Sequence, residues 1–289
     1  MNLNPCKPQF VTAINALLLA FIASMSLAQE KSVPSPGLPL YPLDCAVDKD
    51  GNAFVVDRNL HGLWKYADDK LSVFYEGSPK FRTPMNAPRC VAFDQAGGLL
   101  VGDSATRDIY RVSTDGKIEP VTGGKIGVPM DIAVSSDGTI YVADAELFRL
   151  VKIPPGKSEP ELVANVTPTA VFVDSSDNVW VLTKTAKQVQ IIADDGTSEV
   201  LVSERTFRYP NQIVVKEDGT AFISDGYSKA IWKRTKGGKP EIVVQGAPLD
   251  NPVGLALHGD EVIVTDPRAR QIFKLNAEGK LTPWFEIKR

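Results

Sequence analysis

One unit of sequence recurs six times between residues 41 and 289, and no other feature constrains the fold as strongly. Each copy begins at a proline and spans about 40 residues, and this period with strand-rich content is typical of propeller blades, not helical solenoids. The copies cover about residues 41–87, 88–128, 129–167, 168–209, 210–251 and 252–289. We therefore expect one domain built from six equivalent units.

The third copy shows the local pattern most clearly. Its stretch Pro129–Asp144, PMDIAVSSDGTIYVAD, has two apolar strands separated by Asp137-Gly138. Asp-Gly pairs tolerate the positive φ angles that two-residue hairpins need. A loop of about five residues, a third strand, a second turn and a fourth strand complete the copy. The pattern predicts four antiparallel strands in each unit.

The predicted strands are apolar on both faces, as in AFVVD and LLVGD. A strand needs that composition when both of its faces are buried, and each blade of a propeller lies between two others. The sequence therefore predicts an all-β fold, a six-bladed β-propeller of four-stranded antiparallel blades. A two-layer β-sandwich would not explain six equal copies. Because the last copy ends with its own outer strand, we expect the ring to close by side-chain packing of the first blade on the last.

Residues 1–28 resemble a secretory signal peptide. Lys7 precedes an apolar run, and the small residues Ser26 and Ala28 flank a signal-peptidase site. The run is short for a bilayer span and contains Asn15, which disfavours an uncleaved anchor. We expect a secreted or periplasmic mature protein that is not embedded in a membrane. Residues 29–40 contain three prolines and are expected to form an extended lead-in.

Charge and composition exclude several classes of function. The net charge of −3 gives no reason to expect nucleic-acid binding. Two histidines are too few for a cluster of histidine metal ligands, and no Gly-x-Ser-x-Gly stretch, phosphate loop or zinc spacing is present. Cys45 and Cys90 stand one position out of register, so buried free thiols are expected rather than a disulfide. Asn165 lies in a glycosylation sequon that matters only in a cell that glycosylates.

An aspartate ends the second strand of five copies. These residues could be metal ligands around the ring, but a carboxylate at a strand end can also accept N–H bonds from the loop that follows. We favour the structural role because it repeats around the ring; the residues are Asp57, Asp103, Asp144, Asp225 and Asp266. The fourth copy has Thr183 instead and also lacks the basic residue eight positions later. We therefore hypothesise that each aspartate and that basic residue form one structural set.

The second and third strands together resemble a known repeat. The segments VVDRNLHGLWKY, VGDSATRDIYRV, ISDGYSKAIWKR and VTDPRARQIFKL resemble the NHL repeat. The same unit occurs in the six-bladed TolB-like superfamily, which includes the senescence-marker-protein and gluconolactonase enzymes. The resemblance covers residues 41–289 and implies the propeller fold. It constrains function weakly, because one fold hosts many functions.

The resemblance to the lactonases implies a divalent cation at the axis, held by oxygen ligands that suit Ca²⁺. The lactonases' Pro-Asn-Gly stretch is similar to Pro210-Asn211-Gln212, so Asn211 carries over as a candidate ligand. Their Glu-Gly-Pro stretch is missing, and Val253 stands where an aspartate is expected. Asp44 and Asp131, each two residues after a repeat proline, could substitute. The candidate metal ligands are therefore Asp44, Asp131 and Asn211.

Residues just after each repeat proline begin the innermost strand, so we expect their side chains to crowd the central channel. Charged groups there must either pair with one another or await a ligand, because desolvating unpaired charge is unfavourable. The candidate ligand-binding residues are Asp44, Arg89, Asp131, Asn211 and Gln212, with Arg208 and Tyr209 at the rim. No catalytic residue can be assigned.

Alternating strand direction places the first and third turns of every blade on one face, here called the turn face. The proline segments and five-residue loops share the other, the loop face. Acidic residues gather in the turns, whereas Arg58, Arg89, Arg107, Lys184 and Arg208 lie in loop-face segments, so we expect a positive loop face. The favoured function is a binding module that takes a small polar or anionic ligand, or a protein partner, on the loop face and in the channel. The alternative is a metal-dependent hydrolase of the lactonase type with its site at the channel mouth.

Overall fold

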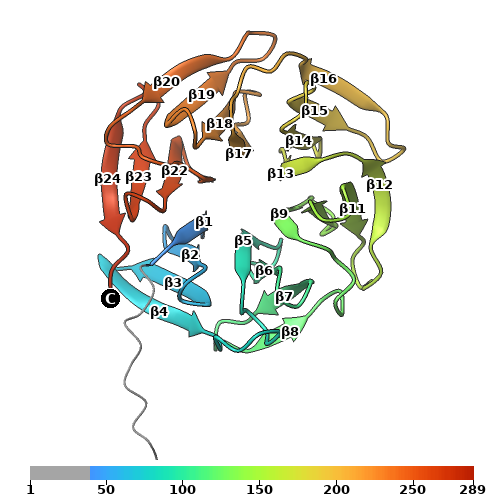
Figure 1. The fold of residues 1–289 in the computed structure, drawn as a ribbon, viewed down its shortest axis with the longest axis vertical. Coiled ribbons are helices and arrows are strands. Elements are labelled where there is room, and N and C mark those ends of the chain that lie inside the picture. The colour runs from blue at the N-terminus through green and yellow to red at the C-terminus, as the bar shows by residue number, and fades with distance from the viewer. Residues whose placement is uncertain (1–39) are drawn as a thin grey trace, which may run out of the picture. The chain divides into compact units, whose positions relative to one another are not determined.

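A computed structural model describes residues 40–289 and shows six four-stranded antiparallel sheets arranged in a ring (Figure 1). The expected signal peptide, residues 1–28, and nearly all of the lead-in lie outside the described residues. Within residues 40–289, no helix could cross a membrane. The prediction of an all-β, six-bladed propeller is confirmed.

The strands follow the chain in order, four to a blade. Blades 1 and 2 contain β1 (Pro42–Val47), β2 (Ala53–Asp57), β3 (Gly62–Ala67), β4 (Lys70–Glu76), β5 (Pro88–Phe93), β6 (Leu99–Asp103), β7 (Asp108–Val112) and β8 (Ile118–Pro120). Blades 3 and 4 contain β9 (Pro129–Val134), β10 (Ile140–Asp144), β11 (Arg149–Ile153), β12 (Glu161–Asn165), β13 (Pro168–Val173), β14 (Val179–Thr183), β15 (Val189–Ile192) and β16 (Ser198–Val202). Blades 5 and 6 contain β17 (Pro210–Val215), β18 (Ala221–Asp225), β19 (Ala230–Arg234), β20 (Glu241–Gln245), β21 (Gly254–His258), β22 (Glu261–Asp266), β23 (Gln271–Leu275) and β24 (Leu281–Glu286).

The first strand of each blade lies beside the axis and the fourth lies at the rim (Figure 1). Every residue of the second strands β2, β6, β10, β14 and β18 is buried. This follows from their two-sided apolar composition, because sheets of adjacent blades cover both faces. Each fully buried valine or leucine contributes about 1.5–3 kcal/mol relative to an exposed one. The packing between blades therefore provides most of the core.

The ring closes without a shared strand, because each sheet comes from one continuous segment. Blade 1 packs directly on blade 6 through a cluster of buried side chains. The ring of Tyr66 stacks on that of Phe285 with centroids 4.0 Å apart, and Trp284 meets Tyr66 edge-on. The prediction of closure by side-chain packing is confirmed.

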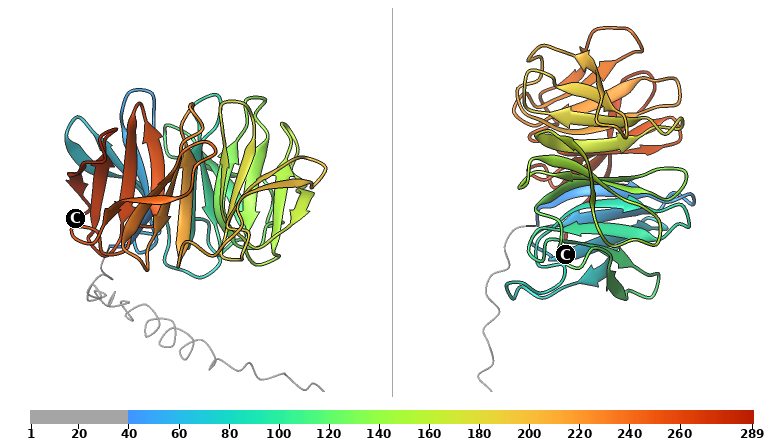
Figure 2. Two further views of the ribbon diagram at one scale, coloured as in Figure 1. Left: turned by 90° about the horizontal axis from the view of Figure 1, so that it is seen from above. Right: turned by 90° about the vertical axis from the view of Figure 1, so that its right-hand side faces the viewer.

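The strands of each blade run between two faces of the ring (Figure 2). Antiparallel pairing from β13 to β16 puts the turns at Asp174–Asp177 and Asp194–Gly196 on the same face, as predicted. Contacts between blades agree, because Tyr141 at the start of β10 donates its hydroxyl to Asp194 Oδ1 at 3.1 Å. In the β9–β10 turn, Gly138 has φ of 88°, which explains the glycine of the Asp-Gly pair.

The five strand-end aspartates are fully buried and hold the incoming loops, which confirms their structural role. Asp144, for example, accepts N–H bonds from Gly127 and Val128 at 3.0 and 3.1 Å and from Leu147 at 3.3 Å. Blade 4 lacks this aspartate and uses Gln188, which exchanges two hydrogen bonds with the backbone of Phe207.

The hypothesis that these aspartates form a set with the basic residue eight positions later is wrong. Asp57 pairs across the sheet with Gly62, whereas Lys65 pairs with Phe54. Three residues along a strand separate the two sites by about 10 Å. The basic side chains therefore lie toward the turn face, where Lys152 contacts Asp194 at 2.7 Å.

Candidate functional site

One position of the inner strands, two residues after each repeat proline, surrounds the axis of the ring. The residues there alternate between polar and small types from blade to blade. In chain order they are Asp44, Cys90, Asp131, Ala170, Gln212 and Gly254. Blades 1, 3 and 5 thus supply the polar groups, and blades 2, 4 and 6 leave room for them. We call these six residues the axial ring.

The two aspartates of the axial ring each connect their own blade to the next one. Asp44 Oδ1 accepts the N–H of Cys45 and Oδ2 accepts that of Val91 in blade 2, both at 2.9 Å. Asp131 repeats the pattern with Ile132 at 2.9 Å and with Val171 of blade 4 at 2.8 Å. Hydrogen bonds to charged groups stabilise by about 1.5–3 kcal/mol. Both carboxylates therefore have a structural role.

Gln212 joins the ring across the channel. Its Nε2 donates to Asp131 Oδ1 at 3.1 Å, and its Oε1 accepts the N–H of Ile213 at 3.1 Å. The small residues are needed for close approach of the blades: a Cβ on Gly254 would lie 2.8 Å from the Cα of Asp44. The alternation is thus a packing requirement as well as a pattern of polarity.

Burial perturbs the titration of both ring carboxyls. Desolvation raises the pKa of Asp44 to about 7, although the N–H bonds from Val91 and Cys45 lower it in part. The pKa of Asp131 is raised well above its ordinary value by burial and then by the charge of Asp44. Two buried carboxyls that repel each other favour a state in which a proton is retained. Cys90 is buried beside them, and both Cys45 and Cys90 are free thiols, as predicted.

A cavity of about 250 Å³ occupies the channel. Asp44, Asp131 and Gln212 line it, and the rest of its wall is mainly apolar, with Phe172 and Leu257 among the residues nearest the turns. The inner strands run from the axial ring to the turn face, so the cavity lies on that side of the ring. The three polar side chains therefore lie in the channel, at the end of the cavity nearest the loop face.

The axial residues do not fit the divalent cation that the lactonase resemblance implies. All four carboxylate oxygens of Asp44 and Asp131 accept N–H donors. The side chain of Asn211 is also engaged, because its Nδ2 donates to the carbonyl of Pro252 at 3.3 Å. Within residues 40–289, no group of three or more His, Cys, Asp or Glu side chains could hold a metal. The three candidate ligands are therefore each engaged in hydrogen bonds within the chain.

The remaining candidate residues lie on the loop face, away from the channel cavity. The backbone N–H groups of Arg208 and Tyr209 bind Asp225 at 2.8 and 3.0 Å, which holds this segment at the loop face. Arg89 is partly buried, and its Nε has no hydrogen-bond partner among the described residues. Its Nη1 contacts only the sulfur of Met130, at 3.7 Å. Burial and then the charge of Arg58 lower the pKa of Arg89.

Comparisons with solved structures show what this architecture resembles. A virginiamycin B lyase from Staphylococcus aureus is 17% identical with a TM-score of 0.66, over 87% of this chain and 88% of that one. A gluconolactonase from Xanthomonas campestris is 15% identical with a TM-score of 0.67, over 80% and 84%. A chain of a nidogen/laminin complex is 16% identical with a TM-score of 0.65, over 77% and 89%. The likeness is one of fold. No protein-family model and no curated protein matches the sequence.

A group of exposed apolar side chains lies on the loop face of this propeller, and sequence reasoning identified only Tyr209 among them. They belong to the loops after the second strands and to the segments that enter each blade: Phe81, Leu147, Phe148, Tyr209 and Tyr227. Phe81 and Tyr227 are 74% and 68% exposed. The other exposed large apolar residues among residues 40–289, Val73, Leu162 and Ile242, lie on outermost strands. An aromatic residue in an otherwise polar loop was the available signal.

Proposed function

We propose that this chain is a secreted or periplasmic binding module whose loop face takes a partner that presents carboxylates or other anions. The observation that carries the proposal is the combination of exposed aromatic rings with cations on that face. Lys184 Nζ lies 3.5 Å from the centroid of the Tyr209 ring. Arg208 lies over Tyr227 at 5.2 Å. Aromatic and arginine side chains are the residues most enriched in binding hot spots.

Arg89 has no acidic partner among residues 40–289, and this supports the same proposal. A partly buried guanidinium without an acidic partner is unfavourable for folding, because its hydration is lost and not replaced. The neighbouring charge of Arg58 adds repulsion. A bound anion would remove both penalties. The acidic strand-end residues do not fill this role, because they are buried and bound to backbone N–H groups.

The lactonase alternative has weaker support. The likeness to a gluconolactonase, at 15% identity, concerns the fold. The groups that would hold a cation at the axis, Asp44 and Asp131, are used to connect blades. A binding module requires no cation at the axis, and it explains why polar and aromatic groups are left open on one face.

The proposal can be tested by titration calorimetry at low ionic strength with inorganic phosphate, citrate and an oligoglutamate peptide. We expect at least one of these anions to bind, and binding to weaken with added salt. The double variant Arg58→Ala with Arg89→Ala should weaken it by about tenfold or more, equivalent to about 1.4 kcal/mol. Lys216→Ala with Lys236→Ala, which removes two cations from turn-face segments, is the matched control. Absence of binding, or an equal loss in the control, would overturn the proposal.

A second assay addresses the alternative. The protein would be incubated with aldonolactones in the presence of Ca²⁺, Mg²⁺, Mn²⁺ or Zn²⁺, and its melting temperature measured with each ion. The binding module predicts no metal-dependent turnover and no metal-induced rise in melting temperature. Turnover that disappears in the double variant Asp131→Ala with Asn211→Ala would establish the lactonase instead.

A further inference from the structure

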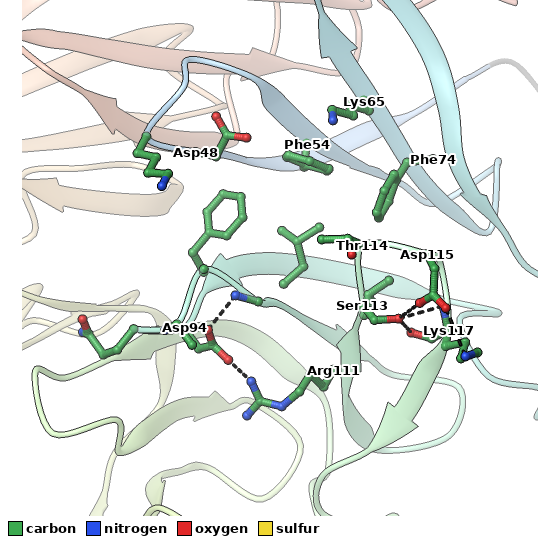
Figure 3. Close-up of a pocket in the computed structure, with 18 of the residues that line it drawn as sticks. Asp48, Phe54, Lys65, Phe74, Asp94, Arg111, Ser113, Thr114, Asp115 and Lys117 are labelled. Carbon is green, nitrogen blue, oxygen red and sulfur yellow. Dashed lines mark hydrogen bonds and ion pairs between the residues drawn. The ribbon is translucent and has the colours of Figure 1, made fainter.

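A cleft opens between blades 1 and 2 on the turn face, opposite the surface proposed above to bind anions (Figure 3). Its volume is about 1070 Å³, which is the size of sites that enclose small organic molecules. Residues of the first turns of both blades and of the third turn of blade 2 form its mouth. We refer to it as the interblade cleft.

The outer strand of blade 2, whose Glu119 lines the cleft, is the shortest of the outer strands among residues 40–289. β8 has three residues, Ile118–Pro120, whereas β4 of blade 1 has seven and the other outer strands have five or six. Pro120 has no N–H of its own, and the next backbone bond to β7 runs from the Val121 N–H to the Ile109 carbonyl at 2.8 Å. Phe74 of blade 1 remains partly exposed beside the cleft.

The floor of the interblade cleft is aromatic. Phe54 meets Phe74 edge-on at 5.1 Å between ring centroids and meets Phe93 edge-on at 5.7 Å. Leu99 and Val112 of blade 2 complete the apolar surface. In Figure 3 the Phe54 and Phe74 rings lie on the blade 1 side, facing the residues of blade 2 across the opening. A flat apolar molecule would find ring faces and edges here.

Lys65 supplies a charge that nothing in the described chain neutralises. Five blades have a cation at this position of the third strand, and four of the five form ion pairs: Arg111 with Asp94, Lys152 with Asp194, Lys233 with Glu241 and Lys274 with Glu261. Within residues 40–289, Lys65 has no acidic partner. Its Nζ lies 5.4 Å from the centroid of the Phe54 ring, at the edge of the cleft.

Most carboxylates that line the cleft are already engaged. Asp48 accepts the N–H groups of Asp50 and Asn52 at 2.9 and 2.8 Å. Asp94 binds Arg111 and the N–H groups of its own turn. Asp115 pairs with Lys117 at 3.1 Å. Asp50 and Glu119 stand exposed at the mouth, where solvent screens them. Lys49 also lines the cleft but is exposed in the first turn, so the ammonium of Lys65, next to the Phe54 ring, is the cation best placed to bind a ligand with an apolar body.

We propose that the interblade cleft binds a small organic anion that has an aromatic or flat apolar body. The body packs on Phe54, Phe74 and Phe93, and its carboxylate or sulfonate receives hydrogen bonds from Lys65 Nζ. The ammonium of Lys65 would then have the anionic partner that the corresponding cations of the other blades find within the chain. This site is independent of the loop face and adds a second binding surface to the propeller.

The test uses 4-phenylbutyrate, with 4-phenylbutylamine and 4-phenylbutanol as matched probes that differ only in the head group. Binding would be followed by amide chemical shifts of the full chain, which also locate the site. We expect the carboxylate to shift residues of β2, β5 and the β7–β8 turn at millimolar concentration, and the amine to bind more weakly by about tenfold or more.

Substitutions separate the two parts of the proposed site. Lys65→Met should reduce the preference for the carboxylate over the alcohol to near unity, and Phe74→Ala should weaken both probes. Lys233→Met removes the equivalent cation of blade 5 and should leave binding unchanged. Failure of the carboxylate to bind, equal binding of the amine, shifts confined to other blades, or unaltered preference in Lys65→Met would each overturn the proposal. Loss of anion binding at the loop face would not affect these outcomes.

Discussion

Charged side chains at the axis and at the loop face of this propeller differ in how fully their hydrogen bonds are satisfied. At the axis, Asp44 and Asp131 are almost fully buried, and every one of their oxygens accepts an N–H group. At the loop face, Arg89 is partly buried and its Nε has no partner within the described chain. The difference shows that burial alone does not reveal the role of a polar group. Its role is revealed by whether all of its hydrogen bonds are satisfied within the protein.

This distinction has an energetic basis. A buried polar group that lacks a partner destabilises a protein by about 1–3 kcal/mol, whereas a satisfied one contributes a smaller net stabilisation. The axial carboxylates therefore hold blades together. The unpaired guanidinium reduces stability unless a ligand completes it, and functional groups commonly have this property. The comparison predicts that substitutions of satisfied polar or tightly packed groups are harmful to stability and that substitution of the guanidinium without a partner is not.

The largest expected effect is at Gly254, where blade 6 meets blade 1. In the variant Gly254→Ala the new Cβ would lie 2.8 Å from both Asp44 Cα and the carbonyl oxygen of Leu43. Backbone atoms cannot rotate away, so the ring must open slightly, and we expect a loss of about 2–3 kcal/mol in chemical denaturation. Gly238→Ala is the control, because its Cβ meets the Oγ1 of Thr235, which can turn aside. Equal losses in the two variants would contradict the packing argument.

The next effect concerns a satisfied carboxylate beneath the loop face. Asp144→Asn replaces an oxygen that accepts N–H groups with an NH₂ group, and it removes the partner of Arg149 Nε at 3.0 Å. We expect a loss of about 1–3 kcal/mol in the free energy of unfolding. A loss below about 0.5 kcal/mol would show that the strand-end aspartates are not structural anchors.

The third effect is a pH dependence that arises at the axis. Because the folded-state pKa of Asp44 is raised to about 7, the folded protein binds this proton more tightly than the unfolded chain does. Its contribution to stability is therefore fully present below about pH 4 and is lost as pH rises toward 7. The slope can reach about 1.4 kcal/mol per pH unit for one proton.

Asp44→Asn should flatten the stability profile between pH 4 and 7 relative to the unaltered chain. Denaturation curves across this range, with the exposed Asp50→Asn as control, would measure the difference. A profile in Asp44→Asn that keeps the slope of the unaltered chain would place the responsible proton elsewhere.

The smallest effect is expected at Arg89, and its sign is the sharpest test of the comparison. Arg89→Met keeps most of the volume and removes a charge that lacks an acidic partner, so the melting temperature should stay the same or rise, with a gain of up to about 1 kcal/mol. Arg149→Met removes a guanidinium that is paired with Asp144, and this variant should lower the melting temperature. A marked loss of stability in Arg89→Met would mean that the residue is structural and would remove one support for the proposed function.

Much of the architecture could be predicted because it is encoded locally. Period, turn pairs and two-sided apolar strands such as β10 each depend on a few adjacent residues. The same holds for the strand-end aspartates, whose N–H donors include those of the next loop. The partner of each third-strand cation depends on the register of the strands, and for Lys152 the partner, Asp194, lies in the neighbouring blade, so the two could not be matched from spacing alone.

The sites were harder to predict because they depend on contacts between different blades. The axial position of Asp44 and Asp131 followed from the repeat, but the donors that satisfy them, Val91 and Val171, come from other blades. The interblade cleft is lined by turns and strands of two different blades, and no local sequence pattern marks it. Exposed loop aromatics such as Tyr227 have no periodicity that would identify them.

The alternation of the axial ring means that the blades are not interchangeable parts. A blade that brings an aspartate or glutamine to the axis must stand between two that bring a small residue, as Asp131 stands between Cys90 and Ala170. Exchanging two adjacent blades would set polar groups against each other and leave a gap elsewhere. Moving blades in consecutive pairs preserves the order. The centre of the ring is therefore built from three consecutive pairs of blades. Recombination or redesign of the chain should keep each pair together as a unit of about 80 residues, twice the sequence period.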